Sequence, residues 1–190
     1  MKARTPRSEC IQFRLAVKDV QPEIWRELVV PPDISLETLH SIVQVLMGWE
    51  KKHLYAFVIN KKRYMSVSDV DDGPGAKAHS TQATLSRALA GTGDILYEYD
   101  FGDDWHVVLS RQPRDTGFAP SQAAQCIRGS RRGPVEDSGG SRGYMEKSRI
   151  YTNPHHKQYA QVRKLFGSDF NAEALDLAKI NSELRKLGAG

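Results

Sequence analysis

The sequence predicts an α+β fold in a single compact domain over residues 1–190, with a mainly antiparallel sheet packed by an N-terminal helix and helices in the C-terminal third. Apolar and polar residues alternate over Ile11–Val17 and Tyr97–Phe101, which is the period of half-buried strands. Apolar residues recur every three or four positions over 36–47 and again after 159, as in helices. A chain of 190 residues with 39% hydrophobic content is long enough to enclose one core.

Two strands and a helix are expected first. The strands span Ile11–Val17 and roughly Ile24–Val30, and the second ends at two prolines, which cannot donate to a ladder. Asp33 or Ser35 caps the helix that follows, and Gly48 ends it. Its inward face consists of Leu36, Leu39, Ile42, Val43, Leu46 and Met47.

The middle of the chain alternates short strands with turns. His53–Ile59 is rich in β-forming residues and is expected to pair with Arg63–Val67 across a polar turn. Residues 69–80 have no periodicity and are expected to form a loop. A short helix follows over Leu85–Ala90, closed by Gly91.

An acidic, aromatic hairpin comes next. Tyr97–Phe101 forms its first strand, Gly102-Asp103-Asp104 supplies turn chemistry, and Trp105–Leu109 returns. From 113 to 141 the composition shifts to Gly, Pro, Ser and Arg, which predicts a long connection.

Helices are expected after this connection. Asn153-Pro154 has the pattern of a cap followed by proline at the first helical position. The last helix carries apolar residues from Leu175 to Leu187.

The net charge of +4 conceals two oppositely charged segments. Between Met65 and Ser110 eight acidic residues accompany two basic ones, and between Arg128 and Lys164 nine basic residues accompany three acidic ones. We expect the segments to face and neutralise one another; the alternative is a basic surface for phosphate or nucleic acid.

The composition favours a soluble cytoplasmic protein with no membrane contact. No run of 18 apolar residues occurs, and the first residues lack the apolar core of a signal peptide. Cys10 and Cys126 are too few for a disulfide scaffold or a structural zinc site, so we expect reduced thiols.

Five groups of residues, in order, carry a family resemblance. They are Pro22-Glu23-Ile24-Trp25-Arg26; Leu36-Glu37-Thr38-Leu39-His40; Gly48-Trp49 with His53-Leu54; Tyr97-Glu98-Tyr99-Asp100-Phe101-Gly102-Asp103-Asp104-Trp105; and Pro134-Val135-Glu136-Asp137 with Gly139-Gly140 and Gly143-Tyr144. Together they resemble the plasmid pRi open-reading-frame-three-like family, the insertion-sequence passenger proteins. The resemblance extends over most of the chain and implies a compact α+β domain, often found near mobile elements. It implies no established activity.

Two positions depart from the family pattern. Members often have a cysteine between the Glu-Asp pair and the Gly-Gly, where this chain has Ser138. Many also have a histidine two residues after the motif tryptophan, whereas His106 follows Trp105 directly. On a strand this shift moves the imidazole to the opposite face.

The candidate acidic cluster consists of Asp100, Asp103, Asp104, Glu136 and Asp137. Carboxylates suit a divalent cation such as Mg²⁺ or Mn²⁺, and no other cofactor is expected. The alternatives are that the hairpin acids only build a turn and that Glu136 and Asp137 pair with nearby arginines.

The remaining polar residues are more ambiguous. The candidate anion or nucleic-acid contacts are Arg26, Arg128, Arg131, Arg132 and Arg142. Trp25 is expected in the core, with the guanidinium of Arg26 exposed or paired. Lone histidines such as His40 and His53 are expected to be packed and hydrogen-bonded rather than catalytic.

Three functions follow from these observations. The first is an accessory module of mobile genetic elements that contacts a protein or nucleic acid through its basic segment. We favour this function and the third one over the second. The second is a metal-assisted hydrolase, and the third is a structural or interaction domain. The standard nucleophile, phosphate-loop and dinucleotide motifs are absent from the sequence, so an enzyme is less expected. Convergence of Glu136-Asp137 with the hairpin acids in a cleft would favour the hydrolase.

Overall fold

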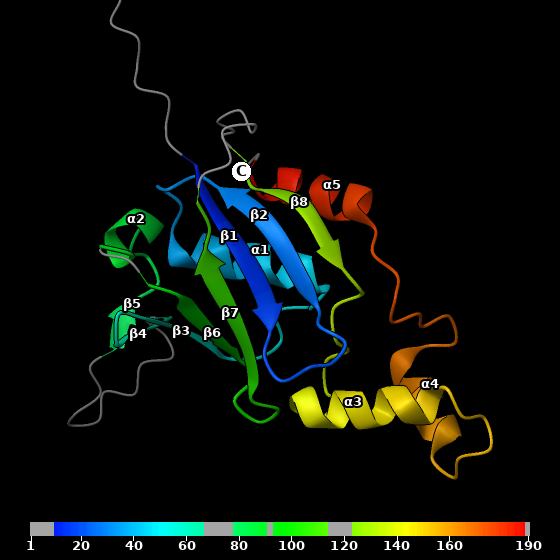
Figure 1. Ribbon diagram of the computed structural model, residues 1–190. Coiled ribbons are helices and arrows are strands. Elements are labelled where there is room, and N and C mark those ends of the chain that lie inside the picture. Colours follow the sequence, from blue (N-terminus) through cyan, green and yellow to red (C-terminus); the bar gives the residue numbers. More distant parts are fainter. Residues whose placement is uncertain (1–9, 67–77, 91–92, 114–122, 189–190) are drawn as a thin grey trace, which may run out of the picture.

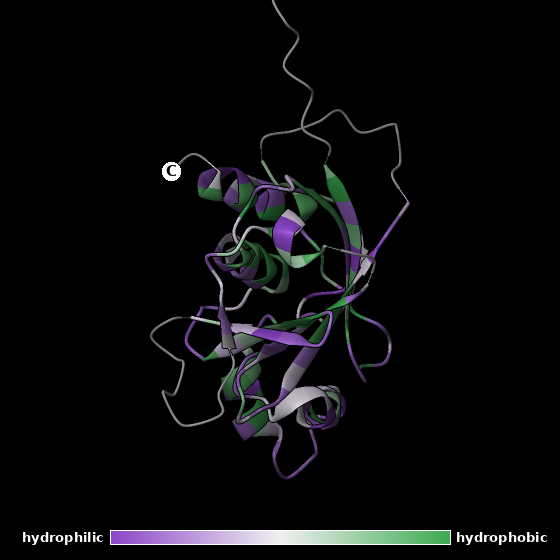
Figure 2. Ribbon diagram, turned by 90° about the vertical axis from the view of Figure 1, so that its left-hand side faces the viewer, coloured by the Kyte–Doolittle hydropathy of each residue, from purple (hydrophilic) through white to green (hydrophobic). Residues whose placement is uncertain are grey.

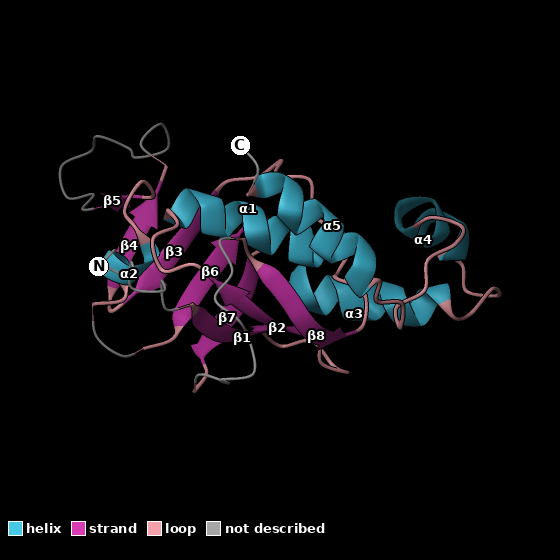
Figure 3. Cartoon of the chain, turned by 90° about the horizontal axis from the view of Figure 1, so that it is seen from above, coloured by secondary structure: helices cyan, strands magenta, loops and turns pink. Residues whose placement is uncertain are grey.

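The computed structural model describes residues 10–66, 78–90, 93–113 and 123–188 (Figure 1). An eight-stranded sheet has the order β5-β4-β3-β6-β7-β1-β2-β8, antiparallel except for the pair β4–β5. Helices α1 and α5 lie side by side over one face, and α3 and α4 extend beyond one end of the sheet (Figure 3). The strands are β1 (Ile11–Val17), β2 (Trp25–Val30), β3 (Tyr55–Ile59), β4 (Lys62–Met65), β5 (Ala78–Ser80), β6 (Ile95–Tyr99), β7 (Trp105–Arg111) and β8 (Gln125–Ser130). The helices are α1 (Leu36–Met47), α2 (Leu85–Ala88), α3 (Gly140–Tyr151), α4 (Tyr159–Phe166) and α5 (Leu177–Leu187). The predicted α+β class is confirmed.

Helix α1 has both predicted ends. The Ser35 hydroxyl accepts the Thr38 N–H at 3.0 Å, so Ser35 rather than Asp33 is the N-cap. Gly48 ends the helix with φ +72°. The predicted inward face is buried against the sheet, and apolar residues gather between the sheet and its covering helices (Figure 2).

The predicted hairpins form. Strands β3 and β4 join through Asn60-Lys61, both with positive φ, as a tight hairpin turn requires. In β6–β7, Tyr99 lies opposite Trp105, and both side chains are fully buried. These aromatic rings fix the hairpin in the core.

Three segments differ from their predictions. The expected connection 113–141 contains the edge strand β8, which pairs with β2 and has little apolar alternation because Cys126 is its one buried residue. Helix α3 begins at Gly140, and Asn153-Pro154 lies in the turn that follows it rather than at a helix start. Of the expected loop 69–80, residues 69–77 lie outside the described residues, as does Gly91, and the last three form β5.

None of the helices in the described ranges is long and apolar enough to cross a membrane.

Candidate metal centre

Three segments distant in sequence meet at the β6–β7 turn. They are the connection 49–54 after α1, the turn 100–104 itself, and the loop 133–139 between β8 and α3. The Glu136-Asp137 loop therefore lies against the acidic hairpin, which is the arrangement that favours the hydrolase hypothesis.

Hydrogen bonds hold the loop 133–139 against the connection after α1. Trp49 Nε1 donates to the Pro134 carbonyl at 2.8 Å. The Glu50 N–H donates to Glu136 Oε2 at 2.9 Å. The tryptophan and acidic residues shared with the family thus position one loop.

Glycines allow the same loop to approach its neighbours closely. Gly140 has φ +65°, and a Cβ there would lie 2.1 Å from the Asp103 carbonyl oxygen. A Cβ on Gly133 would lie 2.0 Å from the Met47 carbonyl oxygen at the end of α1. The Gly139 N–H also donates to Asp103 Oδ2 at 2.8 Å. Any larger residue at Gly133 or Gly140 would push the loop away.

Ser138 closes the loop from within. Its side chain is fully buried, and Oγ donates to the Val135 carbonyl at 2.6 Å. Its own carbonyl accepts from Lys147 Nζ at 2.9 Å. Where family members often have a cysteine, this chain has a structural hydroxyl.

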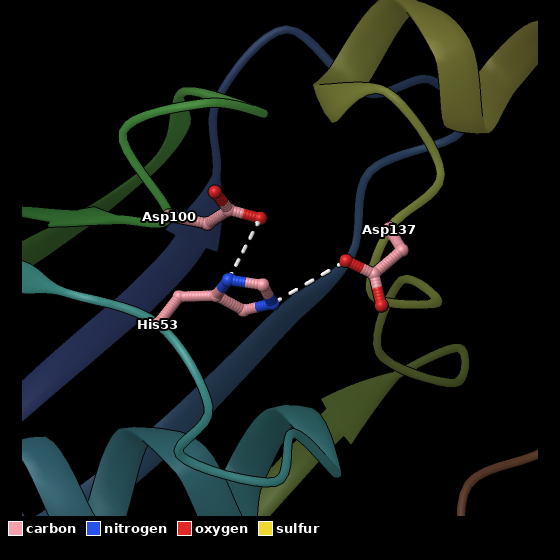
Figure 4. Close-up of side chains that lie close together, drawn as sticks. All are labelled: His53, Asp100 and Asp137. Carbon is pink, nitrogen blue, oxygen red and sulfur yellow. Dashed lines mark ion pairs between the residues drawn. The ribbon is translucent and has the colours of Figure 1, made fainter.

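His53 lies between two carboxylates brought by the other two segments (Figure 4). Its Nδ1 is 3.6 Å from Asp100 Oδ2, and its Nε2 is 3.4 Å from Asp137 Oδ1. One potential ligand atom from each residue lies within 4.8 Å of the others. Asp137 is the most exposed of the three, with 63% of its side chain accessible.

The two carboxylates beside His53 create an electrostatic repulsion at its ring. A neutral imidazole has one N–H, so one of its nitrogens presents a lone pair. With a carboxylate at each nitrogen, that lone pair faces a negative oxygen. Nε2 is buried and makes no hydrogen bond within the described part of the chain. A cation at Nε2, either a proton or a metal ion, removes the repulsion.

Asp100 is positioned to orient the ring. Its Oδ1 accepts the N–H groups of Gly102 at 3.1 Å and Asp103 at 3.2 Å, which leaves Oδ2 directed at His53. Asp100 and Asp137 both have left-handed backbone conformations, with φ of +54° and +56°. Aspartate tolerates this conformation better than most residues.

Glu136 is occupied by structural contacts. Tyr99 donates its hydroxyl proton to Glu136 Oε1 at 2.5 Å, and the other oxygen accepts from Glu50. Burial, and then the bond to Glu136, raise the pKa of Tyr99, which therefore stays protonated. Its ring stacks on Trp49 at 4.7 Å and meets His53 edge-on at 5.6 Å. Tyr99 thus links the loop to the ring of His53.

The five predicted acids are therefore divided by the structure. Asp100 and Asp137 meet around His53, while Asp103 and Glu136 hold the loop. Asp104 points away: it is 74% exposed and lies 3.3 Å from His106 Nε2.

His53 is the residue that the sequence prediction missed. It was expected to be a packed histidine, as His40 is: that ring is buried and stacks on Tyr55 at 3.7 Å. The sequence did contain one indication of its role: His53 belongs to the same family motif as Trp49, which holds the loop 133–139 in place.

Four of the predicted cations have different neighbours. Their positions are as follows: Arg128 pairs with Glu27, Arg131 pairs with Glu173, Arg132 lies over the ring of Phe170 at 5.4 Å, and Arg142 is exposed on α3. Arg128 and Arg131 thus pair with acids outside the acidic segment 65–110, contrary to the expected mutual neutralisation.

Arg26 and Trp25 exchange their expected places. Arg26 is 1% exposed, whereas Trp25 is partly exposed, with the Arg14 guanidinium 5.0 Å from its ring centroid. Successive side chains of a strand point to opposite faces, so only one of these two residues can point into the core. In the structure this residue is the arginine.

A groove of about 990 Å³ adjoins the cluster. The end of α1, the loop 132–137 and the first half of α5 line it, and Arg26 and Asp137 both contribute to its wall. Asp137, the carboxylate nearest His53 Nε2, is thus part of the wall of a space large enough for a small substrate, whereas His53 and Asp100 are not among the lining residues.

Fold and site together define a single-domain α+β protein with a histidine–carboxylate cluster closed by a glycine-rich loop. The chain belongs to the plasmid pRiA4b ORF-3-like protein family, whose model matches residues 9–179. The resemblance predicted from the motifs is confirmed.

Two relatives have comparable length. The chain is 28% identical over 183 residues to "Uncharacterized protein y4hQ" of Sinorhizobium fredii (strain NBRC 101917 / NGR234), covering 94% of this chain and 92% of that protein. It is also similar to the crystal structure of a protein of unknown function, MM3350 from Methanosarcina mazei Go1. The TM-score is 0.73 at 29% identity, over 89% of this chain and 96% of that one.

Proposed function

We propose that this protein binds a divalent cation through His53 Nε2 and Asp137, with Asp100 orienting the imidazole, and that the ion serves metal-assisted hydrolysis in the adjoining groove. The observation that carries the proposal is the buried Nε2 of His53, which has no hydrogen-bond partner in the described structure and faces a carboxylate at 3.4 Å.

The arrangement matches the way proteins orient metal-binding histidines. Such a histidine donates its other ring N–H to a carboxylate, which fixes the tautomer and leaves the ligating nitrogen unprotonated. Asp100 Oδ2, at 3.6 Å from Nδ1, is placed for this contact after a small adjustment. Asp137 then supplies a second ligand from the opposite side.

The donor set favours Zn²⁺ or Mn²⁺ over Ca²⁺. Imidazole suits zinc and other transition ions, whereas calcium takes oxygen ligands alone. Catalytic zinc sites combine three protein ligands with an open position, and His53 and Asp137 supply two ligands, which leaves positions for water and substrate. The ion would lower the pKa of its water and so provide a nucleophile near neutral pH.

Calorimetric titration with ZnCl₂ and MnCl₂ tests the proposal. We expect saturable binding to the wild type and its loss in Asp137→Asn. Removing an orienting carboxylate typically costs about 10–100-fold in metal affinity, which is the expected effect of Asp100→Asn.

A matched control lies on the same hairpin. Asp104 also lies beside a histidine, His106. Among the described residues, no third potential ligand joins these two. Asp104→Asn should leave metal affinity unchanged. An equal loss in Asp104→Asn and Asp137→Asn, or no binding to folded wild type, would refute the proposal.

A second candidate is an accessory role in which α3 and α4 contact nucleic acid, in a cytoplasmic protein of mobile elements. The observation in its favour is a group of exposed basic residues at that end of the molecule: Arg142, Arg149, Lys157, Arg163 and Lys164. Such binding should weaken steeply with salt as counterions are released. Binding of a duplex DNA probe that is unchanged between about 50 and 200 mM salt would contradict it.

A further inference from the structure

Arg26, in the wall of the groove, is a buried cation. It lies on β2 and is 1% exposed, and within the described part of the chain it donates only to backbone carbonyls. Nε donates to Leu46 at 3.2 Å, and Nη1 donates to Trp25 at 2.7 Å and to Ser130 at 2.8 Å. These bonds tie the end of α1 to strands β2 and β8.

No carboxylate of the described ranges pairs with Arg26. Burial lowers its pKa to about 10, and the group that opposes this shift is the Cys126 thiol rather than a carboxylate. Arginine is seldom fully buried without an anionic partner, because a charge removed from water is strongly destabilising unless it is compensated. The partial negative charge at the end of α1 compensates only part of it.

The remaining nitrogen of Arg26 is available to a ligand. Within the described structure Nη2 makes no hydrogen bond. It is also not one of the buried side-chain atoms that lack a partner, so it keeps a small accessible surface. Arg26 lines the groove of about 990 Å³, and its Nε and Nη1 are bonded to carbonyls, so Nη2 is the donor left for a bound molecule.

We infer that Arg26 Nη2 forms a subsite for an oxyanion, the carboxylate or phosphate group of a small ligand in the groove. Three further cations, Lys52, Arg132 and Lys179, line the same groove. A guanidinium is suited to both kinds of oxyanion because its donors are planar and weakly hydrated.

The acidic residues of the groove do not preclude an anion. Six acidic residues line the groove, and four of them are engaged by other groups: Glu50 with Lys52, Glu136 with Tyr99, Asp176 with the Lys179 N–H, and Glu183 with Lys186. The other two, Asp137 and Asp169, are exposed, so water and salt screen their charges, whereas Arg26 is buried and its charge is less screened.

The subsite also indicates a substrate class. Arg26 and Asp137, a proposed metal ligand, line the same groove, so a ligand held by Arg26 can extend along the groove toward the metal. An ester or amide that also carries a carboxylate or phosphate is then the expected substrate. This last step rests on the proposed metal function, whereas the oxyanion subsite does not.

Anion binding to metal-free protein tests the subsite. After dialysis against EDTA, the wild type is titrated with sodium phosphate and with sodium acetate, each against sodium chloride at equal ionic strength. We expect saturable binding of at least one anion, and the tighter one identifies the kind of group. Arg26→Gln should weaken it about tenfold or more, since a charge-assisted donor is lost. Lys179→Gln, a rim cation of the same groove, should change it less than about twofold.

Other outcomes are equally informative. If Arg26→Gln does not fold, the Arg26 Nε–H resonance of the wild type should shift saturably with phosphate or acetate. Unchanged anion affinity in folded Arg26→Gln, no saturable binding of either anion to the wild type, or a larger loss in Lys179→Gln would overturn the subsite. Asp137→Asn should keep anion affinity within about twofold while losing zinc, so the two proposals fail separately.

Discussion

His40 is expected to make the stability of this protein sensitive to mild acid. Its ring is buried, and Nδ1 lies 2.7 Å from the Tyr97 hydroxyl. The Gln44 amide donates to that hydroxyl at 2.9 Å, and the Gln44 carbonyl oxygen accepts from the Lys51 N–H at 2.8 Å. The hydroxyl proton is therefore directed to Nδ1, which must act as an acceptor, and the imidazole must be neutral.

The size of the effect follows from the pKa of His40. Burial, assisted by the charge of Lys51, lowers this pKa from 6.5 to about 4. The unfolded chain takes up a proton near pH 6.5 and the folded protein only near pH 4, so acid favours unfolding between these values. One unit corresponds to about 1.4 kcal/mol, so roughly 3 kcal/mol of unfolding free energy is lost across the window.

Urea denaturation of the wild type and His40→Asn at about pH 7.5 and pH 4.5 measures this contribution. Asparagine keeps an acceptor near the position of Nδ1 but does not titrate. The variant should lose about 2.5 kcal/mol less than the wild type between the two pH values. Other acid-sensitive groups, such as Glu23 paired with Arg14, are common to both proteins and cancel. An equal acid loss in both proteins would refute the assignment to His40.

Two further substitutions test the packing around the site and the edge of the sheet. Gly140→Ala places a methyl group on the Asp103 carbonyl and should cost about 2 kcal/mol or more, together with zinc affinity, because the Asp137 loop is displaced. The control is Gly139→Ala, because Gly139 has a similar positive φ but no atom lies within 3.4 Å of the new Cβ. Denaturation of this variant should show a loss of only about 1 kcal/mol. Equal losses in the two variants would argue against steric displacement. Asn181→Ala removes two hydrogen bonds to the Cys126 backbone, of 2.8 and 2.9 Å, and should cost about 1–2 kcal/mol and accelerate exchange of the Cys126 amide. Unchanged exchange would show that α5 does not protect the β8 edge.

The elements with strong periodicity could be predicted from the sequence. Strand β1, helix α1 and the β6–β7 hairpin carry a clear alternation or a cap, and all three formed as expected. Strand β8 and helix α3 could not be predicted in the same way. Strand β8 takes its hydrogen bonds from β2 on one side and from the side chain of Asn181 on the other, which no local pattern indicates.

The site was only partly predictable for a similar reason. The acids of the hairpin and of the Glu136-Asp137 loop were visible in the sequence, but which of them lie beside His53 and which hold the loop depends on the backbone N–H groups that each one meets. His53 appeared to be an ordinary packed histidine because its two carboxylate neighbours lie 47 and 84 positions further along the chain. Only the folded loop, admitted by Gly133 and Gly140, brings them together.

The metal centre is tested most directly by an anomalous difference map from crystals soaked in ZnCl₂. The strongest peak should lie within about 2.0–2.2 Å of His53 Nε2 and of an Asp137 oxygen, with Asp100 remaining against Nδ1. A map with its only peaks at other groups, such as the exposed His155, or with no peak at His53, would contradict a metal site between the hairpin and the loop.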